Sequence, residues 1–404
     1  MLRSFRIPLL FLFIGSLLGV FLRWQFIEPT RGINYSNFLH GHSHIMFLGW
    51  VFNALYLAFV FNHIEQHRQQ FFKILFYVLQ TLMVAMLISF PLQGYGFWSI
   101  SFSTLHTLGA FVFAVNFIRQ TSSVSSLSMQ CVRIALIFFL VSAAGPFSLG
   151  YLMANDLGAT NWYNFSIYFY LHFQYNGFFF FGILALFISQ LESREIQFNV
   201  NLARTSILLF TVACIPAYLL STLWAKPGYA YNVAGSIAAL LQLAGWVIFL
   251  KMVFDVASSL RNNFTSPSRS LLTLAPLALT AKFVLQILSA FPVIAQLAYE
   301  LRPIVIAYLH LVLVGGISAF LFSWYMETSF IRADRAKAAT LVFIVSFIGM
   351  ECALILSPRW SAVQPVLLFS ASEYIFGFSL LLSLSYLLFG LASRKKADKN
   401  HPFG

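Results

Sequence analysis

Residues 38–61 read FLHGHSHIMFLGWVFNALYLAFVF, a stretch with three histidines and no Lys, Arg, Asp or Glu. An apolar run of about 20 residues is long enough to cross the hydrocarbon core of a bilayer as an α-helix. Polar side chains inside a bilayer are costly and therefore mark candidate functional positions. The stretch predicts a membrane span that carries imidazoles near its beginning.

The whole chain has the same character. Of its 404 residues, 60% are hydrophobic and only 9% are charged, whereas soluble domains carry about 25% charged residues. So few charges cannot cover a water-facing surface, and we expect the lipid bilayer to surround most of the chain. The net charge of +12 does not indicate a nucleic-acid partner, because the charged residues fall in short loops between apolar runs.

The apolar runs predict an all-α fold, a polytopic membrane helix bundle of about twelve transmembrane helices. We expect a single transmembrane domain over residues 1–393 and a charged cytoplasmic tail over 394–404. The predicted spans lie near residues 7–24, 38–61, 71–92, 98–118, 132–154, 163–189, 204–222, 232–253, 270–290, 303–326, 337–356 and 366–391.

The distribution of basic residues tests this number of spans. With twelve spans, 18 of the 24 Lys and Arg residues fall on the side of the two termini, five fall on the opposite side, and Lys282 lies within a span. Basic residues accumulate in cytoplasmic loops, so both termini are predicted to be cytoplasmic. We expect a multi-pass protein of a bacterial-type inner (plasma) membrane.

Three histidines share a local pattern and a depth. Each begins a His-x4-Gly motif, at His44–Gly49, His172–Gly177 and His310–Gly315. The motifs lie 128 and 138 residues apart, on spans 2, 6 and 10, in the outer half of the membrane. The chain therefore reads as three four-helix pseudo-repeats, each with a histidine at the same depth. The glycine would let a helix or a flat cofactor approach the backbone closely.

The histidines are candidate metal ligands, because neutral imidazole is the commonest protein ligand for transition metals. His40 and His44 lie four residues apart on one helix face and could bind one ion. His106 in span 4 and His172 in span 6 are expected at a similar depth. The alternative is a structural role, in which each imidazole hydrogen-bonds a neighbouring carbonyl and fixes helix packing.

Two carboxylates are also predicted within the outer half of spans. Glu373 is expected about seven residues into the last span, near the histidine layer, and Glu351 lies in the preceding span. Either could carry protons or support a ligand histidine. The alternative is a structurally paired carboxylate.

These features resemble subunit I of the heme–copper oxidase superfamily, which includes nitric oxide reductases. The topology and the histidines on helices 2, 6 and 10 carry the resemblance. The segment HGHSHIMFLGW at residues 40–50 is also similar to the His-x-His-x4-Gly-Trp segments of divergent members and of the NnrS family.

The resemblance implies a heme, of b type, held by His42 or His44 together with His310, and it makes His172 a further cofactor ligand, to copper. Span 7, residues 204–222, has no histidine, so a full oxygen-reducing centre cannot be assembled. The implied role is that of an oxidoreductase in electron transfer or in nitric oxide or oxygen chemistry, supplied with electrons by a donor protein or another oxidase-like subunit.

Two other classes of function fit the same composition. Twelve spans suit a transporter, in which the histidine layer would bind a metal or a proton. A transporter predicts inverted repeats and broken helices, whereas the pattern here is of three parallel units. The third class is a non-catalytic assembly or scaffold protein.

Overall fold

The structure is a computed structural model that describes residues 2–359 and 369–393. In these residues twelve helical stretches are long and apolar enough to cross a membrane. Lipid offers no hydrogen-bond partners, so each stretch must satisfy its backbone within its own helix. The all-α fold and the multi-pass membrane character are confirmed.

The spans agree with the predicted ones to within a few residues. The first four comprise α1 (Arg6–Trp24), α2 (Tyr35–His44), η2 (Ile45–Phe52), α3 (Asn53–His63), α4 (Gln69–Gln93) and α5 (Phe97–Gln120). The next four comprise α6 (Leu127–Ser142), α7 (Ala144–Ala154), α8 (Asn161–His172), η4 (Phe173–Phe179), α9 (Phe180–Ser193), α10 (Val200–Ala217), η5 (Tyr218–Ala225) and α11 (Tyr229–Asp255). The last four comprise α13 (Ser266–Leu288), α15 (Arg302–His310), η6 (Leu311–Ser318), α16 (Ala319–Glu327), α17 (Lys337–Leu356) and α19 (Ala371–Ala392).

Short helices between the spans were not predicted. They are η1 (Leu2–Phe5), η3 (Gln66–Arg68), α12 (Ala257–Asn263), α14 (Pro292–Glu300) and η7 (Ser357–Arg359). The last span begins later than predicted, at Ala371. Residues 366–368 of the predicted span lie outside the described residues.

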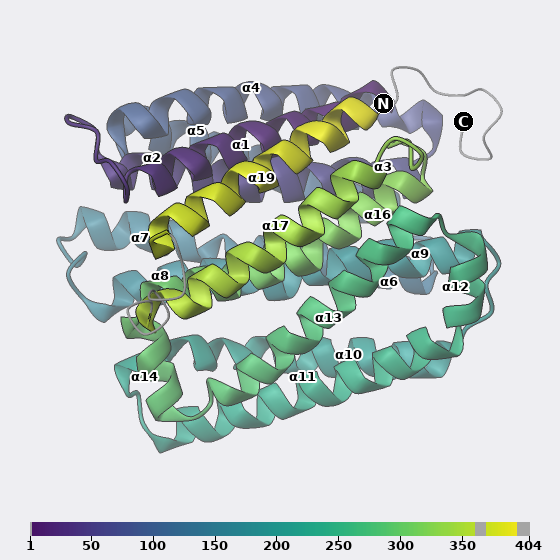
Figure 1. Cartoon of the computed structure of the whole chain (residues 1–404). Helices are drawn as coiled ribbons and strands as arrows, with labels where there is room; N and C mark the ends of the chain where they lie inside the picture. The colour runs from purple at the N-terminus through teal and green to yellow at the C-terminus, as the bar shows by residue number, and fades with distance from the viewer. Residues whose placement is uncertain (1, 360–368, 394–404) are drawn as a thin grey trace. The chain divides into compact units, whose positions relative to one another are not determined.

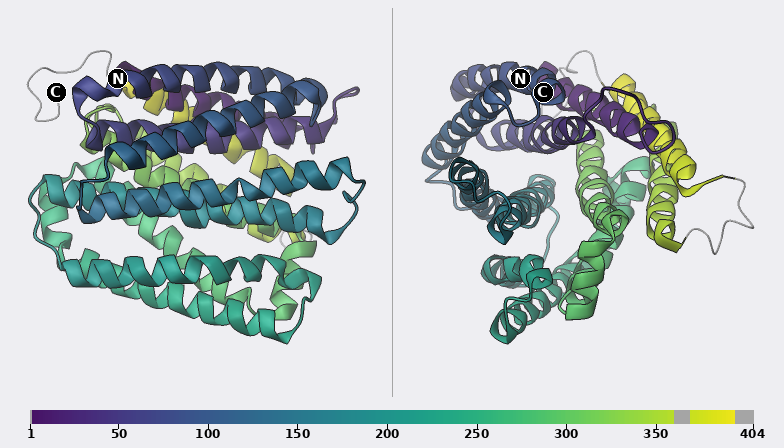
Figure 2. Two further views of the ribbon diagram at one scale, coloured as in Figure 1. Left: turned by 180° about the vertical axis from the view of Figure 1, so that it is seen from behind. Right: turned by 90° about the vertical axis from the view of Figure 1, so that its left-hand side faces the viewer.

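The chain divides into two compact units. Unit 1 comprises Met1–Thr121, Thr265–Leu274 and Ser318–Gly404, and unit 2 comprises Ser122–Phe264 and Ala275–Ile317. Within each unit the long helices run alongside one another (Figures 1 and 2). The second and sixth spans are the most buried. In their most apolar 18 residues, 83% and 94% of the residues are buried, so these segments do not face lipid.

Each repeated histidine occupies the same position in its span. It is the last residue of an α-helix, and a π-helical segment begins at the next residue: η2 after His44, η4 after His172 and η6 after His310. π-helices are rare and concentrate at functional sites. Their recurrence at these three points supports the prediction of three four-helix repeats.

The glycines near these histidines admit a side chain from the first helix of the same repeat. A Cβ atom placed on such a glycine would lie 3.0 Å or less from that side chain, closer than packed atoms allow. The pairs are Gly49 with Phe11 (2.9 Å), Gly177 with Phe138 (2.6 Å) and Gly316 with Leu279 (3.0 Å). The close approach expected of the glycines is therefore that of a helix, and in the third repeat it is seen at Gly316, the residue after the motif glycine.

The opposite ends of two of these spans are tied to the first helix of their repeat by a carboxylate. Glu192 at the end of α9 accepts hydrogen bonds from the amide and hydroxyl of Ser128 in the first turn of α6. Glu327 at the end of α16 accepts from the amide and hydroxyl of Thr265, just before α13, at 2.9 and 3.0 Å. A carboxylate at a helix N-terminus satisfies its unpaired N–H groups and its dipole.

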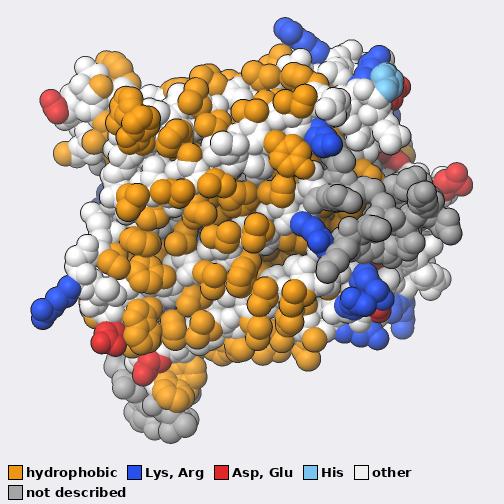
Figure 3. All heavy atoms as spheres, turned by 90° about the horizontal axis from the view of Figure 1, so that it is seen from above, with side chains coloured by type: hydrophobic (Ala, Val, Ile, Leu, Met, Phe, Trp, Pro, Cys, Tyr) orange, Lys and Arg blue, Asp and Glu red, His pale blue; other side chains and the backbone are white. Residues whose placement is uncertain are grey.

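The start of the first span, α1, lies next to the end of the last described span, α19, in unit 1. Arg6 Nη2 donates to the carbonyl of Ser393 at 3.1 Å, as an even number of spans requires. Hydrophobic side chains cover most of the face in Figure 3, and Lys and Arg side chains gather toward one end of it. That this end is cytoplasmic stays a prediction.

The glycine contacts give a test of the fold. We expect Gly177→Ala to lower the free energy of unfolding by about 1–3 kcal/mol, because the new methyl group overpacks against Phe138. Gly150→Ala is the matched control in unit 2, since nothing lies within 4 Å of a Cβ there. Thermal unfolding in detergent measures both, and equal midpoints for the two variants would contradict the packing described.

Candidate functional site

His42 is held by the first helix of the chain. Its Nδ1 donates a hydrogen bond to the carbonyl of Gly15 in α1 at 2.8 Å. A Cβ atom on Gly19, one turn further along α1, would lie 3.0 Å from the His42 ring, so only glycine leaves room for the imidazole there. With the proton on Nδ1, Nε2 carries a lone pair, and it makes no hydrogen bond within the described residues. His42 is thus an oriented imidazole with one available ligand atom.

The other two histidines of α2 lie against aromatic rings near the α4–α5 turn. His40 Nε2 hydrogen-bonds the hydroxyl of Ser36 at 3.1 Å, and the ring lies 4.5 Å from that of Tyr95. His44 stacks on Phe90, with 4.3 Å between ring centroids and 19° between planes. Both rings lie near that of Tyr95, His40 at 4.5 Å and His44 at 6.3 Å between centroids, as a spacing of four residues on one helix face predicts.

His106 in α5 is buried, at 1% exposure, and its Nε2 has no hydrogen-bond partner within the described residues. Its ring contacts the edge of Phe52, at the far end of the π segment from His44. In the described parts of the chain, no three His, Cys, Asp or Glu side chains come close enough together to hold a metal ion. His40, His44 and His106 therefore do not form the predicted metal cluster in unit 1.

His172 in unit 2 is buried at 2% exposure and uses both of its ring nitrogens. Its Nε2 donates to the carbonyl of Cys214 in α10 at 2.8 Å, and its Nδ1 accepts from the amide of Asn176 at 3.1 Å. An imidazole needs a free lone pair to bind a metal. This geometry fits the packing alternative for His172 better than the predicted ligand role.

Further polar groups surround His172, and sequence reasoning missed their grouping. The ring of Tyr175 lies 6.5 Å from that of His172 and 6.3 Å from that of Tyr308. Lys282 of α13, at 3% exposure, places its Nζ 3.8 Å from the ring centroid of Phe283, a cation–π contact. A lysine inside an apolar run was the available signal, but the sequence does not show which groups face it.

His310 ends α15 in unit 2, at the position that His44 holds in unit 1 and His172 in unit 2. It is half-buried. Because His42 and His44 belong to unit 1 and His310 to unit 2, the pairing of span 2 with span 10 stays a prediction.

The two carboxylates differ from each other. Glu373 lies in the first turn of α19, where its carboxylate accepts from the Ser370 amide at 2.7 Å and closes a capping box. The predicted depth of Glu373 is wrong, because the helix begins later than its apolar run and Glu373 is exposed at its start. Glu351 in α17 is buried, at 9% exposure, and one of its oxygens has no hydrogen-bond partner within the described residues.

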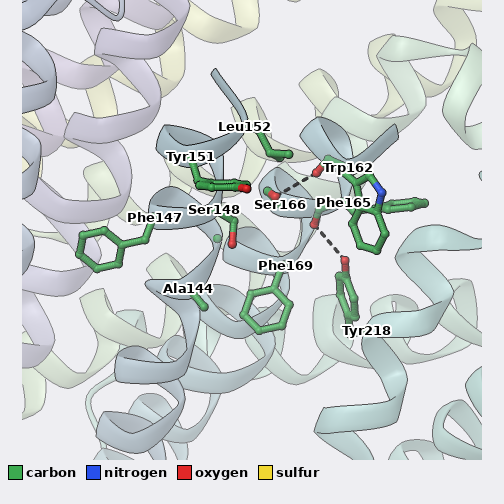
Figure 4. A pocket seen from close by; sticks show the side chains of 11 residues that line it. Ala144, Phe147, Ser148, Tyr151, Leu152, Trp162, Phe165, Ser166, Phe169 and Tyr218 are labelled. Carbon is green, nitrogen blue, oxygen red and sulfur yellow. Dashed lines mark hydrogen bonds between the residues drawn. The ribbon is translucent and has the colours of Figure 1, made fainter. Parts of the chain in front are cut away.

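Unit 2 also holds a pocket of about 690 Å³ between α7, α8 and η5 (Figure 4). Pro146 cannot donate a helical hydrogen bond, and the span breaks into α6 and α7 beside it. Gly145 lies against α8, and the pocket opens between the two helices beyond that contact. Tyr218 lines it, donates to the carbonyl of Phe165 at 2.9 Å and lies 6.0 Å from the His172 ring. None of the predicted ligands lines this pocket.

The bonds of His172 give a second test. We expect Asn176→Leu to destabilise the protein by about 1–3 kcal/mol, because the buried Nδ1 of His172 loses its donor. Asn201→Leu, on the exposed first turn of α10, is the control and should unfold at the wild-type midpoint. Chemical unfolding in detergent compares them, and a wild-type midpoint for Asn176→Leu would show that this hydrogen bond is not formed.

The sequence was compared with protein-family models and with curated proteins. No protein-family model matches this chain, and no curated protein matches its sequence. The resemblance to the heme–copper oxidase superfamily therefore rests on the topology and residues of this chain alone.

Proposed function

We propose that this multi-pass membrane protein binds heme and acts in electron transfer or in the handling of a diatomic gas such as nitric oxide or oxygen. The observation that carries the proposal is the state of His42. Its Nδ1–H is fixed by the Gly15 carbonyl, which leaves the Nε2 lone pair available. An axial heme ligand is usually oriented through such a hydrogen bond, which also raises the basicity of the nitrogen that binds the metal.

The bonding of His42 suits a ligand role better than the bonding of His172 or His40 does. Gly15 and Gly19 bring the α1 backbone against the His42 ring and so fix its orientation. His172 has both ring nitrogens occupied, and His40 bonds Ser36. Of the two candidates in span 2, the geometry favours His42 over His44 as the ligand.

The second ligand proposed is His310, as the family resemblance implies. A heme with two imidazole ligands supplies one-electron transfer when bound. The chain would orient the group through His42 and exclude water with its phenylalanine-rich spans. Copper is left out of this proposal, because the described residues bring no three suitable ligands together.

The transporter alternative predicts inverted repeats and broken helices. The motifs of spans 2, 6 and 10 instead have the same sense along the chain, and each span passes through its π segment into the next helix without a gap. The repeated motifs favour the heme proposal, whereas the break between α6 and α7 beside Pro146 is a feature that the transporter alternative predicts.

A pyridine hemochrome spectrum with metal analysis, on protein purified in detergent, tests the proposal. We expect a b-type spectrum from the wild type and its loss in His42→Ala and in His310→Ala, because each variant removes an axial ligand. His63→Ala, at the end of α3, is the control and should keep the heme. Purified protein without any heme, or with an unchanged spectrum in both ligand variants, would end the proposal.

The fit of Gly19 to the His42 ring gives a separate prediction. We expect Gly19→Val to lower heme occupancy roughly 10–100-fold, the usual effect of disturbing the support of a metal ligand. Gly150→Val, where a side chain meets nothing within 4 Å, is the control. Heme absorbance per protein measures both, and normal occupancy in Gly19→Val would place the heme away from this ring.

A further inference from the structure

A groove runs between the first and last described spans of unit 1, which lie side by side (Figure 1). It has a volume of about 400 Å³ and begins at Arg6, the first residue of α1. Leu10 and Phe13 of α1 and Leu387 and Gly390 of α19 line it. From residue 6 to residue 13 the groove follows α1 for about 10 Å.

The groove is apolar along its length and open to the surroundings of the span. Leu10 is 56% exposed and Leu391 is 69% exposed, and a Cβ atom on Gly390 would meet nothing within 4 Å. In a membrane-spanning helix such surface faces hydrocarbon. An alkyl chain therefore fits the groove chemically.

The end of the groove is cationic. Arg6 uses Nη2 for the carbonyl of Ser393, while its Nε is buried and has no hydrogen-bond partner within the described residues. Within residues 2–359 and 369–393 no carboxylate forms an ion pair with Arg6 either. A guanidinium has five N–H donors and binds phosphate through several of them. A buried donor without an acceptor is costly. Within the described residues the guanidinium therefore has donors without an acceptor, and an anionic oxygen could accept from them.

We propose that the groove between α1 and α19 binds one anionic phospholipid, with its phosphate on Arg6 and an acyl chain between Leu10, Phe13 and Leu387. Basic groups at the ends of membrane helices recognise anionic headgroups in this way. The positive-inside prediction places this end of α1 in the cytoplasmic leaflet. The inference is independent of the proposed heme.

Native mass spectrometry of the full chain in detergent, with equal amounts of phosphatidylglycerol and phosphatidylcholine added, tests the charge. We expect the wild type to retain phosphatidylglycerol preferentially and Arg6→Gln to lower that preference roughly five-fold. Arg204→Gln is the matched control, because Arg204 is an exposed cation at the start of α10 and should leave the preference unchanged. An equal preference in wild type and Arg6→Gln would overturn the proposal.

A second experiment tests the shape of the groove and leaves Arg6, the proposed headgroup contact, unchanged. We expect Gly390→Leu to fill the groove and to reduce phosphatidylglycerol retention, whereas Gly377→Leu, also with nothing within 4 Å on the same helix, should retain it. Retention by Gly390→Leu at the wild-type level would refute the groove as the site.

Two further experiments identify which group causes the preference for phosphatidylglycerol. Inorganic phosphate added in excess should leave the bound lipid in place, whereas its displacement would mark Arg6 as a site for free phosphate and overturn the lipid. Lys395→Gln with Lys396→Gln should keep the preference. Its loss there, with Arg6→Gln unaffected, would assign the preference to the tail instead.

Discussion

The structure depends on a change of backbone hydrogen bonding in three membrane spans. Directly after a histidine, each span passes from α-helical bonds, four residues apart, to π-helical bonds, five residues apart. In the first repeat the amide of Asn53 bonds the carbonyl of Leu48, five residues back, so that the carbonyl of Gly49 needs another donor. The side-chain amide of Asn53 donates to it at 3.0 Å and also pairs with Gln80. In lipid no water could replace that donor, which accounts for the buried amides of Asn53 in the second span and Gln80 in the third.

The π-helical segments also define equivalent positions around the three repeated histidines. The position two residues before the repeated histidine is His42 in the first repeat, Tyr170 in the second and Tyr308 in the third. A glycine of the preceding helix lies against this side chain in the first two repeats, Gly19 at His42 and Gly145 at Tyr170. The repeats thus share a frame in which the chemistry differs: an imidazole with an available nitrogen in one, tyrosines in the others. This difference points to His42 as the distinctive site.

Much of the fold could be predicted from the sequence, because span length and charge placement are set by the bilayer. The twelve apolar runs coincide with the helices, and the His-x4-Gly spacing marks the repeats. The π segments could not be predicted, because a one-residue change in hydrogen bonding leaves no periodic signal over seven or eight residues. The predicted depth of Glu373 was wrong because an apolar run does not show where its helix begins: α19 begins at Ala371, with Ser370 as its N-cap.

The candidate site was harder to predict than the fold. The partners of His172 and His42 are backbone carbonyls, of Cys214 and Gly15, and a carbonyl carries no residue type that a sequence could reveal. Depth alone made these histidines look equivalent, although one has both nitrogens occupied and the other does not. Spacing along the chain gives the layer in which a side chain lies but not the atom it faces.

The central claim is that Nε2 of His42 is a ligand atom. A cryo-electron microscopy map of the protein purified with its native content, in lipid nanodiscs, tests it most directly. We expect porphyrin density whose iron contacts Nε2 of His42, while Nδ1 keeps its bond to the Gly15 carbonyl. A map without porphyrin density, in which Nε2 of His42 bonds another protein group, would contradict it.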